Sequence, residues 1–423
     1  MKLRQIRVSG YKNLIDCSVN LGDFNVLVGP NNSGKSNLLE AIQMLWPLCF
    51  GDEKLRNVIL MGMPVPSRLC PSSMCHLEEH RNKPLKIGVS FEVQLDEQSW
   101  AVDYDVHVQC GESDIENVGF LYEKLTAKVP GRPGPVTTYI LREKVQEKEV
   151  INVKVNRKGI PKEHPISKRI PSLQAISSLY PDFKGLPEEL TIFIEMIRWI
   201  GTTKVFAISP KGMREKINKE EMIEGICTTS FDLLYVLDQI KEDGEYFEVF
   251  KESLCDILDF EQVYFETQDV PAVAKDKKPS KATKRVRMFA VKRTGSEPSF
   301  IEEYSDGTLV VIAVLEALFS ENSLKGPILC LEELENCLHP EAVDKLLRFL
   351  QDNSDRWPVL ITTHSPYLLN GVKPTDVNVA VVDETGATHF EKVKNTRQLR
   401  EYLSKSLMSF GDLLVNNYDR FRE

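Results

Sequence analysis

The sequence has 423 residues, 42% of them hydrophobic and 27% charged, and a formal net charge of −9. This length allows a sizeable core in one large domain or two, whereas the net acidity argues against a nucleic-acid binder that is basic over its whole surface. No apolar run is long enough to cross a membrane and residues 1–6 lack the apolar core of a signal peptide, so we expect a cytoplasmic protein without a membrane partner.

The N-terminal part of the chain predicts short strands around one helix. Strands are expected at 2–9, 16–21 and 24–28, a helix at 37–45, and a loop-rich segment without periodicity at 50–83. From 84 to 156 hydrophobic and polar residues alternate, with further β-like runs at 136–142 and 150–155. We therefore predict an antiparallel β subdomain in this region.

The middle of the chain predicts an α-helical lobe. Helical patterns are expected at 171–199, 212–222, 229–241 and 244–259, with a strand at 203–208. The sequence shows no internal repeat and no sustained heptad pattern.

The basic feature of the chain is the stretch from Lys275 to Arg293, in which Asp276 is the single acidic residue. Pro279 and Ser280 suit a turn, so the stretch predicts a solvated hairpin loop. The same charges could instead contact a nucleic-acid backbone, which gives sequence-independent and salt-sensitive affinity. Both interpretations remain open at this point.

The nine cysteines follow no disulfide framework and predict reduced, mostly buried thiols, among them Cys49 and Cys330. Four residues that zinc accepts as ligands lie close together in the sequence: Cys70, Cys75, His76 and His80. Their spacing matches no finger or ribbon pattern. This cluster is either a metal site or a plain loop.

Residues 29–36, Gly-Pro-Asn-Asn-Ser-Gly-Lys-Ser, match the phosphate-loop pattern GxxxxGK[ST] without a mismatch. The expected strand before the loop and helix after it direct backbone N–H groups and the helix dipole at an anion. Gly29 and Gly34 permit the tight curvature. Lys35 is expected to reach the β- and γ-phosphates, and Ser36 to bind Mg²⁺. The motif therefore predicts a nucleotide site.

Two acidic residues end an apolar run in the C-terminal part. Residues 327–333 predict a buried parallel strand that delivers Glu332 and Glu333 to its carboxyl end. Beside a phosphate loop, Glu332 would hold Mg²⁺ and Glu333 would act as general base; alone, the pair could simply end a strand at a solvated turn. The next strand, 359–362, leads to His364, which either senses a γ-phosphate or is an ordinary loop residue.

Between these motifs, Ser305, Asp306, Gly307 and Thr308 precede an apolar helix at 309–318. A hydroxyl and free N–H groups at a helix start make a second anion site, whereas simple N-capping by Ser305 or Asp306 explains the same residues. The spacing alone does not choose between them.

In their order along the chain, these motifs resemble the ABC-type ATPases of the RecF/SMC/OLD group. The segments that carry the resemblance are 3–14, 29–37, 305–308, 331–340 and 361–366. It covers the two ends of the chain, 1–46 and 300–395. The resemblance implies an α/β P-loop NTPase of the ABC ATPase-head type, with an antiparallel β subdomain and an inserted α-helical lobe.

The resemblance also implies how ATP and Mg²⁺ would be bound. Two heads would dimerise and sandwich two ATP molecules, with Ser305, Asp306 and Gly307 as the signature motif that contacts the γ-phosphate held by the opposite protomer. The residues of the phosphate loop expected to contact the nucleotide are Gly29, Asn31, Asn32, Ser33, Gly34, Lys35, Ser36 and Asn37.

The remaining roles follow from the motifs of the second half. Glu332 takes the Walker B magnesium position, Glu333 the catalytic base position and His364 the switch histidine position. Glu335 and Asn336 would fall in the loop that couples the two active sites.

Three departures from the family pattern concern Glu332, Leu334 and Gln174. Much of the superfamily has Asp at the position of Glu332, although the OLD-like branch resembles this Glu-Glu form. Leu334 stands where that branch has Pro. Gln174 is the one candidate that we name for the glutamine loop.

On this resemblance the chain divides into four parts. They are the N-terminal part of the head with Walker A (1–49), a β-rich and helical insertion (50–200), a helical lobe with the basic hairpin (201–299), and the C-terminal part of the head with signature, Walker B and switch histidine (300–423).

The leading hypothesis is an ATP-hydrolysing switch that dimerises on ATP and gates a separate effector, such as a nuclease or toxin, in bacterial anti-phage defence. OLD nucleases continue into a Toprim domain, which we do not expect in this sequence, so the cutting activity would belong to another chain. The alternative is a RecF-like DNA repair clamp on duplex DNA. A scaffold that binds ATP without turnover is a third hypothesis.

Overall fold

The structure is a computed structural model. It describes residues 1–61, 80, 83–95, 97–111, 118–130, 136–143, 150–157, 160–180, 184–203, 205–207, 244–270, 283–291, 299–300, 304–319, 327–394 and 397–416. Three of the four candidate zinc ligands, Cys70, Cys75 and His76, lie outside these ranges, as do the helices expected at 212–222 and 229–241. Among the described residues, no group of three or more His, Cys, Asp or Glu could hold a metal ion.

The largest sheet is antiparallel and has the strand order β2-β1-β4-β5-β6-β7-β8-β9. Its strands are β1 (Lys2–Ser9), β2 (Cys17–Asn20), β4 (Leu85–Leu95), β5 (Gln98–Gln109), β6 (Gly119–Lys128), β7 (Thr137–Arg142), β8 (Val150–Arg157) and β9 (Ile160–Ser167). The predicted antiparallel β region is confirmed, and it extends past 156 to include β9. Because β4 pairs with β1, this region continues the sheet of the two N-terminal strands.

The central sheet has the order β10-β14-β15-β3-β16-β17. It consists of β10 (Val205–Ala207), β14 (Leu329–Glu332), β15 (Val359–Thr363), β3 (Phe24–Val28), β16 (Val377–Val382) and β17 (Thr388–Lys392). All neighbouring pairs are parallel except β16 with β17, which form an antiparallel hairpin. Parallel strands run in the same direction, so the carboxyl ends of strands that are far apart in the sequence lie at the same edge of this sheet.

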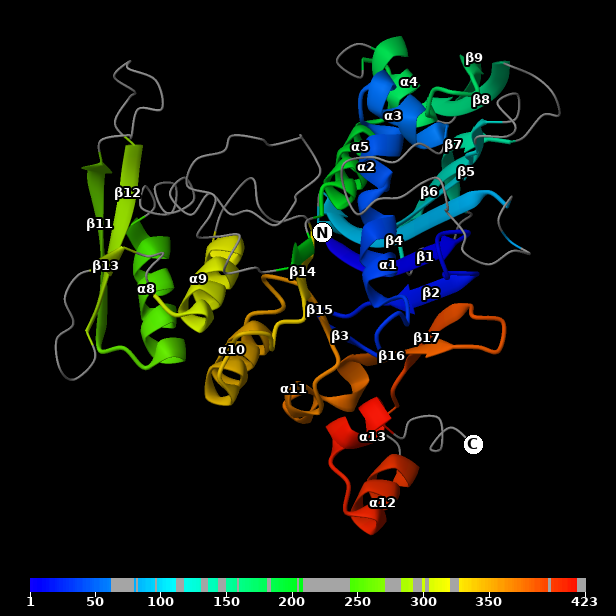
Figure 1. Ribbon diagram of the computed structural model, residues 1–423. Helices are drawn as coiled ribbons and strands as arrows, with labels where there is room; N and C mark the ends of the chain where they lie inside the picture. The colour runs from blue at the N-terminus through cyan, green and yellow to red at the C-terminus, as the bar shows by residue number, and fades with distance from the viewer. Residues whose placement is uncertain are drawn as a thin grey trace.

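Helices cover both faces of the central sheet (Figure 1). On the side of the antiparallel sheet lie α1 (Lys35–Gln43), α2 (Leu45–Cys49), α3 (Glu53–Leu60), α4 (Ser172–Leu179) and α5 (Glu188–Gly201). On the other side lie α8 (Gly244–Leu258), α9 (Asp306–Phe319), α10 (Pro340–Asp352), α11 (Pro366–Asn370), α12 (Arg397–Ser406) and α13 (Phe410–Asn416). None of the helices in the described ranges is both long and apolar enough to span a membrane.

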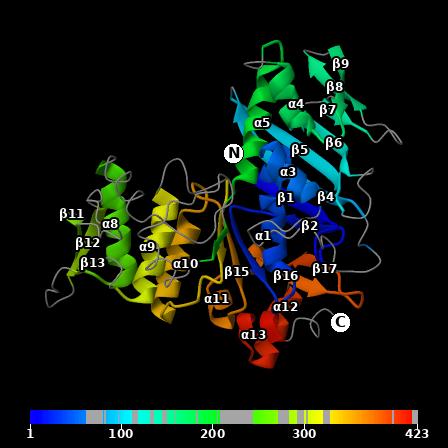
Figure 2. The ribbon, with the colours of Figure 1, turned by 45° about the horizontal axis from the view of Figure 1, so that its top comes forward.

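Alternate residues of the central strands face two separate hydrophobic clusters. Cys330 of β14 and Leu360 of β15 pack with α1 and the antiparallel sheet, whereas their neighbours Leu331 and Ile361 pack with α9 and α10. Such alternation follows from the pleat of a strand, which points successive side chains to opposite faces. The central sheet thus separates α1 from α9, as both ribbon views show (Figure 2).

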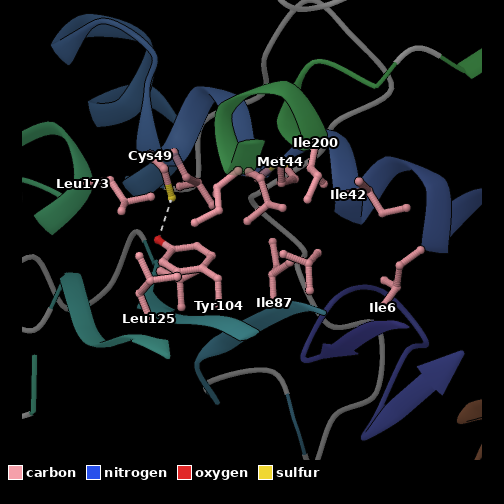
Figure 3. Close-up of a cluster of buried hydrophobic side chains, with 14 of the residues drawn as sticks. Ile6, Ile42, Met44, Cys49, Ile87, Tyr104, Leu125, Leu173 and Ile200 are labelled. Carbon is pink, nitrogen blue, oxygen red and sulfur yellow. Dashed lines mark hydrogen bonds between the residues drawn. The ribbon is translucent and has the colours of Figure 1, made fainter. Parts of the chain in front are cut away.

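The cluster between α1 and the antiparallel sheet contains one polar contact of interest. Figure 3 shows that Cys49, the last residue of α2, approaches the Tyr104 hydroxyl in β5, at 3.4 Å. Burial raises the pKa of the Cys49 thiol to about 12, so it remains a neutral thiol. The predictions of buried thiols at Cys49 and Cys330 are confirmed.

Two predictions of secondary structure need correction. The loop-rich interpretation of 50–83 is wrong for α3, which Asp52 caps by accepting a hydrogen bond from the Leu55 N–H at 2.6 Å. The hairpin-loop interpretation of 275–293 is wrong for its second half, since Thr283–Val291 is strand β12. It pairs with β11 (Gln262–Val270) and β13 (Ser299–Phe300) in a small antiparallel sheet.

Candidate nucleotide-binding site

The phosphate loop, residues 29–36, joins the carboxyl end of β3 to the start of α1. Asn32 and Gly34 have left-handed backbone conformations, with φ of 64° and 88°. A Cβ on Gly29 would lie 2.7 Å from the Ser33 hydroxyl, so both glycines of the motif are required by geometry. The loop therefore has the strand, turn and helix context predicted for a site that binds phosphate.

Lys35 lies across this loop. Its Nζ donates hydrogen bonds to the carbonyl oxygens of Gly29 at 2.6 Å and Pro30 at 2.9 Å, and the residue is only 7% exposed. Burial lowers the pKa of the Lys35 ammonium, and the nearby Glu333 and Glu332 oppose this change. Among the described residues the Lys35 ammonium donates its hydrogen bonds to neutral carbonyls. A buried cation in such surroundings is suited to a phosphate ligand, because an anion would compensate the loss of hydration.

The Ser36 hydroxyl meets Glu332 across the site. Ser36 Oγ donates a hydrogen bond to Glu332 Oε1, although the two residues are 296 positions apart in the sequence. Glu332 ends β14, which is separated from β3 only by β15. A hydroxyl and a carboxylate oxygen are the hard donors that Mg²⁺ accepts, so the two residues fit a magnesium ion. The Ser33 hydroxyl is buried and has no partner among the described residues, which leaves a further donor in the loop.

Glu333 follows Glu332 in a left-handed conformation, with φ of 50°. Its backbone N–H donates to the Thr362 carbonyl of β15 at 2.9 Å, which fixes the turn after β14. The side-chain amide of Asn336 donates to Glu333 Oε2 at 2.7 Å. The Glu333 carboxylate is therefore oriented by its own loop and is 39% exposed, as a group that meets water must be.

His364 lies just after β15, beside the same carboxylates. Its Nδ1 is 3.7 Å from Glu333 Oε1 and 3.8 Å from Glu335 Oε1. Glu335 also accepts hydrogen bonds from the Thr363 hydroxyl at 2.7 Å and from the His364 backbone N–H at 3.2 Å. Glu335 thus ties the end of β15 to the loop after β14, a local role that the sequence does not reveal.

Residues 305–307 lie at the start of α9, apart from the residues described above. Ser305 caps α9, since its hydroxyl accepts from the Thr308 N–H at 3.2 Å. A Cβ on Gly307 would lie 3.0 Å from the Cys337 carbonyl, so Gly307 packs against the loop after β14. The helix α9 lies on the opposite face of the central sheet from α1 (Figures 1 and 2). The structure brings Lys35, Ser36, Glu332, Glu333 and His364 together, and it does not bring Ser305, Asp306 and Gly307 to the phosphate loop of the same chain.

Gln174, the candidate for a glutamine loop, belongs to α4. Its side-chain carbonyl accepts a hydrogen bond from Arg56 of α3 at 2.5 Å. Both ribbon views place α4 far from the start of α1 (Figures 1 and 2). The interpretation of Gln174 as a glutamine-loop residue is therefore wrong.

Two ATPase-domain families match the sequence. The family described as "AAA ATPase domain" matches residues 1–198. The family described as "AAA domain, putative AbiEii toxin, Type IV TA system" matches residues 217–370. The first match contains the phosphate loop and the second contains Ser305, Glu332, Glu333 and His364, so the two together span the whole candidate site. No curated protein sequence matches the chain.

Among solved structures, SMC heads align with most of the chain at low identity. The SMC head domain from Thermotoga maritima is 13% identical, with a TM-score of 0.43, and covers 93% of this chain and 100% of that one. An SMC head bound to the C-terminal winged-helix domain of ScpA is 12% identical, with a TM-score of 0.49, and covers 93% of this chain and 99% of that one. A third SMC head, from Pyrococcus furiosus, is 12% identical, with a TM-score of 0.44, and covers 96% of this chain and 100% of that one.

Because the TM-scores are below 0.5, the assignment of the fold depends on the sheet order and on the two families. A parallel central sheet carries the phosphate loop after β3 and the acidic pair after β14, with β15 and His364 between them. Together with the two family matches, this arrangement supports a P-loop ATPase of the ABC/AAA class.

Proposed function

We propose that the protein hydrolyses ATP with Mg²⁺ at this site. The observation that carries the proposal is the contact between the Ser36 hydroxyl and Glu332, with Lys35 in the same loop and Glu333 as the next residue. This combination offers oxygen donors for a magnesium ion, a cation for phosphates and a carboxylate for water.

Each side chain would then have a distinct part in the reaction. Lys35 and the N–H groups of the loop would bind the β- and γ-phosphates, while Ser36 and Glu332 would hold Mg²⁺, which screens the charge that develops on the phosphates. Glu333, oriented by Asn336, would accept a proton from the attacking water. His364 would contact the γ-phosphate from the end of β15.

We also propose that two copies of the chain share each ATP. Ser305 and Gly307 lie at the start of α9, across the central sheet from α1, and this position supports a second chain as the one that would bring them a phosphate bound by its Lys35. In the partner, the start of α9 would approach the phosphate loop of the first chain. The dimer would then depend on the γ-phosphate, and its hydrolysis would release the two copies.

The biological role that we propose is an ATP-dependent switch for a separate effector, such as a nuclease or toxin, in defence against phage. The match of residues 217–370 to a family described by the AbiEii toxin of a type IV toxin–antitoxin system supports this context. The role of the effector is taken from that context and from the resemblance to OLD-type heads.

The experiment that tests the proposal is light scattering after size exclusion, combined with measurement of phosphate release. We expect the wild type to release phosphate with Mg²⁺ and ATP. Glu333→Gln should accumulate a species of twice the mass and lose hydrolysis, whereas Lys35→Ala should not respond to nucleotide. If all three proteins keep the same mass and release no phosphate, the proposal of an ATP-dependent dimer is wrong.

The alternative function is a RecF-like clamp on duplex DNA, which the basic residues of 275–293 favour. Part of this stretch is β12, where Lys284, Arg285 and Arg287 lie in one strand. A clamp should bind duplex DNA with an affinity that falls steeply with salt, and replacing these three residues by Gln should flatten that dependence. A switch instead predicts copurification with an effector and no such loss.

A further inference from the structure

Asn13, in the turn between β1 and β2, contacts three parts of the molecule with one side chain. Its amide nitrogen donates to the Asn32 carbonyl of the phosphate loop at 3.2 Å and to the Thr388 hydroxyl of β17 at 2.9 Å. Its amide oxygen accepts from the Asn37 side chain of α1 at 2.7 Å. The Thr388 N–H in turn donates to the Asn13 carbonyl at 2.8 Å.

The same two residues surround Gly34. A Cβ at Gly34 would lie 3.0 Å from both Asn13 Oδ1 and Thr388 Oγ1. Thr388 is fully buried, so its hydroxyl is fixed in place against the loop. Gly34 therefore has to be glycine for two reasons, its left-handed φ and the space that Asn13 and Thr388 occupy.

The position of these contacts in the sheet separates them from the metal-binding side. In the order β14-β15-β3-β16-β17, the acids Glu332 and Glu333 approach the phosphate loop from β14, whereas Thr388 approaches it from β17. Ser36 and Glu332 therefore define one side of the loop, and Asn13 with Thr388 supports it from the other.

We propose that Asn13 and Thr388 are positioning residues that hold the phosphate loop in its nucleotide-binding conformation before the nucleotide arrives. Left-handed residues such as Asn32 are costly and persist only where the surroundings enforce them. The hydrogen bond to the Asn32 carbonyl fixes the peptide group between Asn32 and Ser33, and the packing of Thr388 on Gly34 fixes the start of α1. A loop held in this way loses less conformational entropy on binding. This inference depends on the proposed function only in naming the ligand as a nucleotide.

The test uses Thr388→Val, which removes the hydroxyl and keeps the shape, and Thr388→Ser, which keeps the hydroxyl. The first measurement is hydrogen–deuterium exchange of residues 29–37 in protein without nucleotide. We expect faster exchange in Thr388→Val and in Asn13→Ala, and exchange near that of the wild type in Thr388→Ser. Thr126→Val makes the same change at a buried threonine of β6 and serves as the matched control. It should leave exchange of the loop unchanged.

The second measurement is calorimetric titration with Mg²⁺ and ADP, which is not consumed. Loss of one hydrogen bond should weaken ADP binding about fivefold in Thr388→Val, while Thr388→Ser stays within about twofold of the wild type. In phosphate release, the KM for ATP should rise by a similar factor with little change in kcat, because the reacting groups are untouched. Asn13→Ala with Thr388→Val should cost less than the product of the single effects, because the two share a hydrogen bond.

The outcomes separate this inference from the proposed function. If Thr388→Val has the loop exchange and ADP affinity of the wild type, the positioning role is wrong even though the ATPase stands. If the wild type binds no nucleotide, the proposed function is wrong, and the exchange measurement still decides whether Asn13 and Thr388 hold the loop.

Discussion

Ser36 of the phosphate loop donates its hydroxyl hydrogen bond to the carboxylate of Glu332 at the end of β14. The two residues come from the parts of the chain that two different ATPase families match. Their contact is made by the central sheet, in which β15 is the single strand between β3 and β14. The site therefore exists only when both ends of the chain are folded together.

The first prediction concerns magnesium at this contact. Ser36→Ala and Glu332→Gln each remove one oxygen donor suited to Mg²⁺, so both should lose most of the increase in ATP affinity that Mg²⁺ gives to the wild type. Affinity in the presence of EDTA should change little, because Lys35 still binds the phosphates. Calorimetric titration of ATP with and without Mg²⁺ measures the difference. Equal responses to Mg²⁺ in wild type and Glu332→Gln would remove Glu332 from the metal site.

The second prediction concerns pH. Burial lowers the pKa of Lys35 from its ordinary value, so the free protein loses this cation at a lower pH than an exposed lysine would. ATP binds the protonated form, so its affinity should fall as the pH rises through that lowered pKa, and binding should be accompanied by proton uptake. Titrations in buffers of different ionisation enthalpy would detect the uptake. Lys35→Arg, which stays charged, should show no decline over the same alkaline range.

The third prediction tests whether ATP is shared between two chains. Lys35→Ala and Ser305→Ala should each be inactive alone. Mixed in the presence of Mg²⁺ and ATP, they should regain part of the wild-type phosphate release, at most about half per dimer, because each mixed dimer has one intact site of two. If Ser305 acted on the nucleotide of its own chain, the mixture would stay inactive. Mixing Lys35→Ala with Glu333→Gln provides the control, since both substitutions affect the same site and no activity should return.

The fourth prediction concerns the buried ion pair between Arg142 and Glu123. Both residues are fully buried, and Arg142 Nε lies 3.3 Å from Glu123 Oε2. The Glu123 carboxylate also accepts hydrogen bonds from the N–H of Ser172, at 2.7 Å, and from its hydroxyl. Glu123→Ala should therefore lower the free energy of unfolding by about 3–5 kcal/mol, because it leaves the buried guanidinium without its charge partner.

Urea unfolding measures this cost against an exposed pair. Lys154 and Glu163 lie 3.7 Å apart and are each 53% exposed. Glu163→Ala should change the stability by less than about 1 kcal/mol, since solvent screens such a pair. A similar small effect for Glu123→Ala would show that Arg142 finds other compensation when the carboxylate is removed.

Much of the site could be predicted from the sequence because its parts are local patterns. The loop 29–36, the acidic end of 327–333 and the position of His364 each follow a buried strand, and the carboxyl ends of parallel strands meet at one edge. The structure brings these side chains together as expected. The contact between Asn13 and Thr388 could not be predicted, because it joins residues 375 positions apart and Thr388 belongs to no motif.

Secondary structure was harder to predict where the composition of a short segment fits both a loop and a helix or strand. Half of residues 53–60 are hydrophobic, but the Pro, Gly and Cys residues after them suggested a loop for the whole segment, whereas Asp52 starts a helix there by capping it. The lysines and arginines of β12 favoured a solvated turn, whereas pairing with β11 makes them part of a strand. In both places local composition was outweighed by hydrogen bonding that single residues do not specify.

The alternation along β14 links catalysis to stability through the strand register. Leu329 and Leu331 pack in the cluster of α9, Cys330 in the cluster of α1, and Glu332 comes next at the site. Inserting or deleting one residue in this four-residue strand would turn each side chain to the opposite face. It would place Glu332 in apolar surroundings and remove it from Ser36 in the same step. Such a change of strand register should therefore yield protein that fails to accumulate, rather than a folded chain that has lost only its ATPase activity.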